Sequence, residues 1–419
     1  MNAADFLQII SSDIWMFVLA VLISFIVFYP FYRYRIKGVL DPLLLSVIMG
    51  SFANIVPIVM YFTHNIKAEH FWYFVCSEVC FWGIYFIKTR NSDKLFSDNG
   101  TKSSVLNEYP LFFLLFMIYF LLTIYGYRIN GIPIFNSSRF EENVDNSSGI
   151  LGLLNRFCSM FSLFINMYLM HMVYLKRTKR AAVFIAIVLL FGILSGSKGF
   201  ILKLVQAYFC YMVFFHALVP RLPKLVMGII AISPIVTILL ASYASGLGES
   251  FGYLGYRLIA SGDVYWNGFG NAVVDNIRVG SPILNMTYFL WGPFRHLLGI
   301  TVSEQLMTTV GSLVFEESSG FFPSGGAPNS RLSILSWIDF RWAGLFLSMS
   351  LGFFSSYLYR YCYRKKSSTI GGACVKYLLL SASLSFVSDV YLGFNAFFGI
   401  VPFLIIYYGY RLLKMVNTR

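Results

Sequence analysis

Residues 13–37 read DIWMFVLAVLISFIVFYPFYRYRIK, an apolar run of about 20 residues that ends in three basic residues. Such a run is long enough to cross a bilayer as a helix. Similar runs recur along the 419-residue chain, which is 58% hydrophobic and only 12% charged. A β-barrel would instead show alternating segments of about 10 residues. The sequence therefore predicts an all-α, polytopic integral membrane protein.

The apolar runs predict about 11 transmembrane helices. They cover residues 13–32, 39–62, 71–88, 109–127, 150–175, 181–195, 200–219, 225–245, 338–359, 372–388 and 395–411. A further apolar stretch at 283–300 is interrupted by Gly292 and Pro293 and carries charge at Arg295. We expect this stretch to form an interfacial or re-entrant helix pair.

The positions of the basic residues predict the orientation of the chain. Its net charge is +13, and most of the 32 Lys and Arg residues fall in six turns. These turns are Arg33–Lys37, Lys88–Lys102, Lys176–Arg180, Arg221–Lys224, Arg360–Lys376 and Arg411–Arg419. If the N-terminus lies outside, all six turns face the cytoplasm, as basic loops prefer. The charge then reflects topology and contact with anionic membrane lipids, so no nucleic-acid partner is expected.

This topology divides the chain into three parts. Residues 1–245 form an eight-helix bundle with an outer loop at 128–149, residues 246–337 form a large outer loop, and residues 338–419 form three further helices and a cytoplasmic tail. The acidic N-terminus lacks the basic segment of a cleavable signal peptide. All six Cys lie in or beside apolar runs, so neither a disulfide framework nor a metal site is expected, and no cofactor is expected.

The large outer loop contains four Arg and no Lys as its basic residues. Arginine presents a planar fork of donors that suits phosphate and diphosphate oxygens. The candidates for binding such a group are Arg278, Arg295 and Arg331 with Asn329 from this loop, and Arg139 and Lys198 from earlier outer turns. Lys198 could equally extend its ammonium group to the lipid headgroups. Asn329 lies in a Pro-Gly-Asn cluster that is also typical of a turn.

The same loop offers candidates for acid–base chemistry and for sugar binding. Arg257, Asp263 and His296 are the candidate catalytic residues, with Asp263 or His296 as the general base. Arg257 and Asp263 could alternatively form an ion pair within the loop, and His296 could have a structural role. The rings of Tyr256, Tyr265 and Trp266 could stack on sugars or anchor the loop at the membrane interface.

Four segments together resemble the bacterial O-antigen polymerase (Wzy-type) family, which is related to the O-antigen ligases. They are GIPIF at 131–135 with Arg139 after it, LLFGILSGSKGFIL at 189–202, YRLIASGDVYW at 256–266, and SGGAPNSR at 324–331 before an apolar run with WAG at 342–344. Arg257 and Asp263 match an R…GD element, and Asn329 and Arg331 match a PN-x-R element. Lys198 departs from the pattern, because the family often has Arg there.

The resemblance implies a fold and a reaction. The fold would be a membrane glycosyltransferase (GT-C-like) architecture in the bacterial inner membrane, with the active site facing the periplasm. The reaction would polymerise oligosaccharide repeat units, with undecaprenyl-diphosphate-linked oligosaccharides as both donor and acceptor, and a chain-length regulator is a further implied partner. An O-antigen ligase acting on the lipid A core, or a flippase for the same lipid-linked unit, are the alternative functions.

Overall fold

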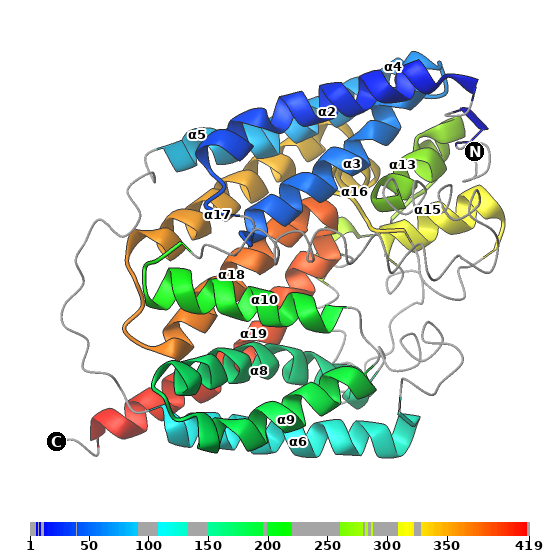
Figure 1. Cartoon of the computed structure of the whole chain (residues 1–419). Helices are drawn as coiled ribbons and strands as arrows, with labels where there is room; N and C mark the ends of the chain where they lie inside the picture. The colour runs from blue at the N-terminus through cyan, green and yellow to red at the C-terminus, as the bar shows by residue number, and fades with distance from the viewer. Residues whose placement is uncertain are drawn as a thin grey trace.

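The structure is a computed structural model, and it describes most of the predicted bundle and part of the large outer loop. The described residues are 6, 8–9, 12–38, 40–90, 108–132, 149–195, 199–219, 260–279, 281–283, 286–287, 309–321 and 328–416. All secondary structure within them is helical. Figure 1 shows the long helices side by side, with the N-terminus and the C-terminus near opposite ends of the bundle.

Helical segments occupy ten of the predicted transmembrane ranges. They are α2 (Ile14–Tyr34), α3 (Pro42–Phe62), the continuous α4 (Ala68–Glu78), η1 (Val79–Gly83) and α5 (Ile84–Thr89), α6 (Tyr109–Asn130), α8 (Gly149–Tyr174), α9 (Thr178–Leu194), α10 (Gly199–Cys210) with η4 (Tyr211–Phe215), α17 (Gly344–Arg364), α18 (Ile370–Ser388) and α19 (Val390–Val416). The predicted range 225–245 and most of 283–300 lie outside the described residues.

Five of the described helices, α2, α3, α6, α18 and α19, are long and apolar enough to cross a membrane. Helices α3 and α18 are largely buried by their neighbours, whereas α2 and α6 expose apolar side chains such as Leu22, Ile26 and Leu121. A surface of this kind suits lipid better than water. The described part of the chain is therefore all-helical and suited to a membrane, and a full set of about 11 spans remains a prediction.

The helix ends are capped by side chains close to the basic turns. The carboxylate of Asp41 accepts hydrogen bonds from the backbone N–H groups of Leu43 (2.9 Å) and Lys37 (2.9 Å) at the start of α3. Glu108 accepts from the N–H groups of Ile370 (2.8 Å) and Gly371 (3.2 Å) at the start of α18. These carboxylates satisfy donors that a helix start leaves unpaired. The described basic turns lie at this same end of the bundle (Figure 1).

Short helices at the opposite end cover the bundle (Figure 1). They are η6 (Ala260–Gly262), α13 (Asp263–Gly268), η7 (Gly270–Asp275), α15 (Val310–Ser319), α16 (Leu332–Phe340) and η9 (Arg341–Ala343). We expected the large loop to end at residue 337 and a span to begin at 338. Instead α16 is buried from Leu332 to Ile338, the chain turns at Arg341 with φ 52°, and α17 begins at Gly344. The end of the loop is thus part of the packed bundle.

Gly262 lets this outer segment approach helix α3. A Cβ atom at Gly262 would lie 2.6 Å from the backbone oxygen of Ala53 and 2.9 Å from Cγ2 of Val56. A helix backbone cannot move away from such a contact as a flexible side chain could. The absence of a side chain at Gly262 therefore places the start of α13, and with it Asp263, directly against α3.

We predict that Gly262→Ala destabilises the protein by about 1–3 kcal/mol, because overpacking forces the outer segment away from α3. The matched control is Gly126→Ala in α6, where a Cβ atom would meet nothing within 4 Å. Thermal unfolding of detergent-solubilised protein, followed by size-exclusion chromatography after heating, measures the difference. Equal unfolding temperatures for Gly262→Ala and the wild type would contradict the close packing.

Candidate functional site

The candidate site is built around the guanidinium group of Arg331, which immediately precedes helix α16. The Arg331 side chain is 1% exposed, although Arg is almost never fully buried without a partner. Its Nε and Nη2 atoms are buried and have no hydrogen-bond partner among the described residues. A buried charged group with unused donors costs free energy unless neighbouring groups or a ligand compensate it.

Three carboxylates from separate parts of the chain act electrostatically on Arg331. They are Glu78 at the end of α4, Asp263 at the start of α13, and Asp389 between α18 and α19. The hydroxyl of Tyr265 in α13 also interacts with the guanidinium. Within the described part of the chain none of these acids forms a direct ion pair with Arg331. We call Arg331, Glu78, Asp263, Asp389 and Tyr265 the Arg331 cluster.

Asp263 has the environment expected of a general base. Burial raises its pKa to about 7, and the backbone N–H of Val264 and the charge of Arg331 oppose this shift only in part. Its Oδ1 atom is buried and has no hydrogen-bond partner within the described residues. A carboxylate with a pKa near the working pH can accept a proton and release it again. Asp263 and Arg331 were both predicted as site residues, and the structure brings them together.

Asp389 has a different role, because backbone groups hold it. Burial raises its pKa to about 6. Hydrogen bonds from the backbone N–H groups of Leu392, Ser330 and Tyr391 lower the pKa and offset part of this shift. The bond from Tyr391 N–H to Oδ1 is 2.9 Å and the bond from Ser330 N–H to Oδ2 is 3.1 Å. Asp389 therefore caps the start of α19 and fastens the residue before Arg331 to it.

Ser330 ties the Arg331 segment to two other elements. Its hydroxyl accepts a hydrogen bond from the backbone N–H of Gly311 at the start of α15 (2.8 Å). Its carbonyl oxygen accepts one from the N–H of Val390 (3.4 Å). Ser330 is completely buried, and its neighbour Asn329 is exposed. The backbone N–H of Arg331 donates to the carbonyl of Asn329 (2.8 Å), which forms the tight turn expected of this Pro-Asn segment.

The two described aromatic candidates are covered by other rings. Tyr265 is fully buried, and its hydroxyl lies 2.9 Å from the hydroxyl of Ser333. Trp266 is 2% exposed, and its ring stacks on Phe6 with centroids 5.0 Å apart. Both side chains therefore contribute to packing in this structure. Their role in sugar stacking remains a prediction, and it requires that the covering ring first move away from Trp266.

The other predicted site residues are not part of this cluster. Arg278 is exposed after η7. The predicted residues Arg139, Lys198, Tyr256, Arg257, Arg295 and His296 lie outside the described residues. Glu78, Asp389 and Ser330 were not predicted from the sequence. The one available signal was for Glu78, a carboxylate within an otherwise apolar run.

Asp275 at the end of η7 joins the outer segment to the bundle. Its carboxylate accepts hydrogen bonds from Lys67 Nζ (2.8 Å) and Arg341 Nη1 (3.0 Å), and it lies 3.1 Å from Nε2 of His70. The indole N–H of Trp337 donates to it as well (3.3 Å). Since these partners come from α4, α16 and η9, this acid fixes how the outer segment sits on the helices beneath it.

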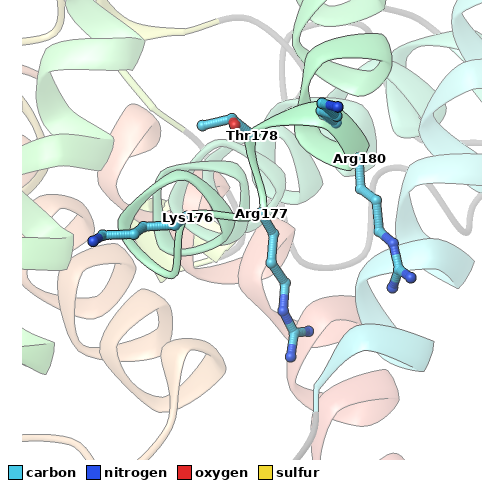
Figure 2. Close-up of a pocket in the computed structure, with 5 residues that line it drawn as sticks. Lys176, Arg177, Thr178 and Arg180 are labelled. Atoms are coloured by element: carbon cyan, nitrogen blue, oxygen red, sulfur yellow. The ribbon is translucent and has the colours of Figure 1, made fainter.

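A basic pocket lies at the opposite end of the bundle, in the turn between α8 and α9. It is lined by Lys176, Arg177, Thr178, Lys179 and Arg180. Figure 2 shows the side chains of Arg177 and Arg180 on the same side of the turn, with Lys176 pointing in a different direction. The arrangement is that of an exposed basic turn suited to anionic lipid headgroups, and none of its five lining residues is a carboxylate.

Comparison with known proteins assigns this chain to no family. No protein-family model, no curated protein and no solved structure matches it. Within the described residues, no group of three or more His, Cys, Asp or Glu side chains has the geometry to hold a metal ion.

We predict that Asp275→Asn lowers the thermal stability of the protein at neutral pH. Burial alone would raise the pKa of Asp275, but the hydrogen bonds from Lys67 and His70 outweigh it and lower the pKa to about 2. A lowered carboxyl pKa stabilises the fold above the unfolded value of about 3.9, and this contribution is lost as the pH falls through the folded value.

The difference in unfolding temperature between the wild type and Asp275→Asn should thus narrow between about pH 4 and pH 2. Glu317→Gln is the matched control, because Glu317 is exposed on α15. If Asp275→Asn unfolds at the wild-type temperature at neutral pH, the network does not hold the outer segment in place.

Proposed function

We propose that this chain is a glycosyltransferase of the O-antigen polymerase type, with about 11 transmembrane helices in a GT-C-like arrangement. It would join oligosaccharide repeat units carried on undecaprenyl diphosphate at the periplasmic face of the bacterial inner membrane. The observation that carries the proposal is the electrostatic interaction of Asp263 with Arg331. These residues come from the two segments, YRLIASGDVYW and SGGAPNSR, that most resemble the polymerase family.

The location of the cluster supports the proposal. The outer segment with α13, α15 and α16 lies at the end of the bundle away from the described basic turns (Figure 1). Basic turns favour the cytoplasmic side, so the cluster would lie on the periplasmic side. Nucleotide-activated sugars are not the donors expected there, whereas a lipid diphosphate in the outer leaflet carries its own leaving group.

In the proposed reaction, a hydroxyl oxygen of the acceptor sugar attacks the anomeric carbon of the donor. The bond between this carbon and the diphosphate oxygen breaks, and undecaprenyl diphosphate leaves with the electron pair. Asp263 accepts the hydroxyl proton, and the pKa of about 7 suits this task at neutral pH. Arg331 stabilises the charge that develops on the diphosphate.

The unpartnered nitrogen atoms of Arg331 suit this role. Nε and Nη2 belong to the planar fork that binds anionic oxygens in pairs. Arg331 and Tyr265 are buried, whereas Glu78, Asp263 and Asp389 are half-buried, so the side chains that cover Arg331 must move before a substrate can reach its guanidinium group. Arg139, Lys198, Arg257 and Arg295 remain candidates for further diphosphate contacts, and His296 remains an alternative general base.

The polysaccharide ladder of a deletion strain tests the reaction class. A polymerase predicts that the strain attaches a single repeat unit to its lipid core. Loss of all decoration would instead indicate a ligase, and lipid-linked units retained on the cytoplasmic side would indicate a flippase. Either of these outcomes would overturn the proposed polymerase activity.

Variants of the cluster test the residue assignment. We predict that Asp263→Asn and Arg331→Ala each reduce polymerisation about 100-fold or more at wild-type protein levels, because each removes a group that acts in the transition state. In wild-type membranes the rate should rise with pH through about 7 and then level off, since Asp263 must be ionised to act as a base. Glu317→Gln, an exposed acid of α15, should polymerise at the wild-type rate.

An initial-rate assay with purified lipid-linked repeat units and membrane vesicles measures both effects. Full-length polymer from Asp263→Asn would refute the role of Asp263 as the base. Full-length polymer from cells that carry Arg257→Ala would likewise exclude Arg257 from the site.

A further inference from the structure

Glu78 is a half-buried carboxylate in the third helical segment that the proposed chemistry does not use. It is the last residue of α4, and only side chains hold it. Its Oε2 atom accepts hydrogen bonds from Nδ2 of Asn54 (3.3 Å) and from Nε1 of Trp82 (3.1 Å). Glu78 lies in the predicted span 71–88, and an acidic side chain within a membrane span is costly and usually serves a function.

The backbone next to Glu78 departs from an α-helix. The π-helical turn η1 begins at Val79, and it carries Trp82. The Trp82 ring is fixed by edge contacts with Phe28 (5.4 Å) and Phe31 (5.2 Å). Turns of this type inside α-helices are rare and occur often at functional sites. Here the turn holds the indole N–H on the carboxylate of Glu78.

Gly352 of α17 keeps this π-helical turn packed in place. A Cβ atom at Gly352 would lie 2.6 Å from the backbone oxygen of Phe81. The turn therefore lies directly against the backbone of α17 and cannot shift toward it. Because the backbone and the Trp82 ring are both fixed, the carboxylate of Glu78 has a defined direction.

Arg331 is the one cation among the described residues that acts on Glu78. The other two acids of the Arg331 cluster have backbone partners, since Asp263 is held by the N–H of Val264 and Asp389 by three backbone N–H groups. Glu78 has no backbone partner for its charge. It is therefore the acid of the cluster that depends most on Arg331 for compensation.

We propose that Glu78 is a positioning residue that acts as the counter-ion of Arg331 and sets the direction in which the guanidinium presents Nε and Nη2. This inference rests on the proposed function, because it assigns Glu78 a role in the same site. Glu78 would not touch the substrate. It would act through Arg331, and through Arg331 on Asp263.

The charges that face Arg331 give this role a measurable consequence. They come from Glu78, Asp263 and Asp389, with the hydroxyl of Tyr265 as a further contact. If Glu78 loses its charge, its negative charge no longer offsets the positive charge of Arg331 at Asp263 and Asp389. The ionised form of Asp263 then becomes more favourable, and the base becomes weaker. A purely structural residue would lower the amount of folded protein without moving the pH dependence.

The test compares Glu78→Gln with Glu69→Gln in the vesicle assay. Glu69 is exposed at the start of the same helix, where it accepts a hydrogen bond from Trp342. We expect Glu78→Gln to lower kcat about tenfold or more at equal protein level, as loss of a supporting partner does. Its rate should level off at a lower pH than that of the wild type. Glu69→Gln should keep the wild-type rate and profile.

Two further variants separate positioning from folding. Glu78→Asp keeps the charge and should recover part of the lost rate with the wild-type pH profile. If Glu78→Gln does not reach the membrane, Asn54→Leu replaces it, because it removes the amide N–H that orients Glu78 with little change in side-chain size, and it should lower kcat in the same direction.

The outcomes distinguish this inference from the proposed function. If the wild type forms no polymer from lipid-linked units, the proposed function fails. If the wild type polymerises, Arg331→Ala does not, and Glu78→Gln or its substitute retains the wild-type rate and pH profile, the inference about Glu78 fails alone.

Discussion

The rest of the structure depends on the burial of one arginine. Arg331 is almost fully enclosed by protein, and an uncompensated guanidinium there would be very unfavourable. Its three acidic neighbours come from α4, from α13 and from the turn between α18 and α19. The early, middle and late parts of the chain must therefore meet at this point. The cluster thereby connects the outer segment to α4, α18 and α19, which lie far apart along the chain.

Small residues make this meeting possible. Gly311 lies so close to the carbonyl of Pro328 that a side chain would not fit, and its N–H donates to Ser330. Gly262 plays the same part against α3. The backbone N–H of the buried Ser330 donates in turn to the carboxylate of Asp389. The backbone next to Arg331 is therefore held by contacts with several elements. A site whose groups must keep their directions benefits from such rigid support.

The sequence predicted the helical class, the helix positions and the basic end of the bundle, because hydrophobic periods and charge placement are local properties. It also selected Asp263 and Arg331. It could not reveal that Glu78 joins them, since the pairing of distant helices depends on packing. The π-helical turn after Glu78 and the turn at Arg341 have no local signature. For this reason the predicted start of the ninth span at residue 338 was too early.

The contrast between Asp275 and Asp263, the two acids of the outer segment, supports the roles that we propose for them. Asp275 is surrounded by Lys67, His70 and Arg341, which stabilise its charge and lower its pKa to about 2. Asp263 lies in the same segment, yet burial raises its pKa to about 7. A carboxylate that remains ionised under all physiological conditions can hold structure but is a poor proton acceptor. One that titrates near neutral pH can exchange a proton. The fold thus gives the two acids different environments: Asp275 fastens the segment as an ionised group, and Asp263 keeps the titratable carboxyl group that the proposed reaction requires.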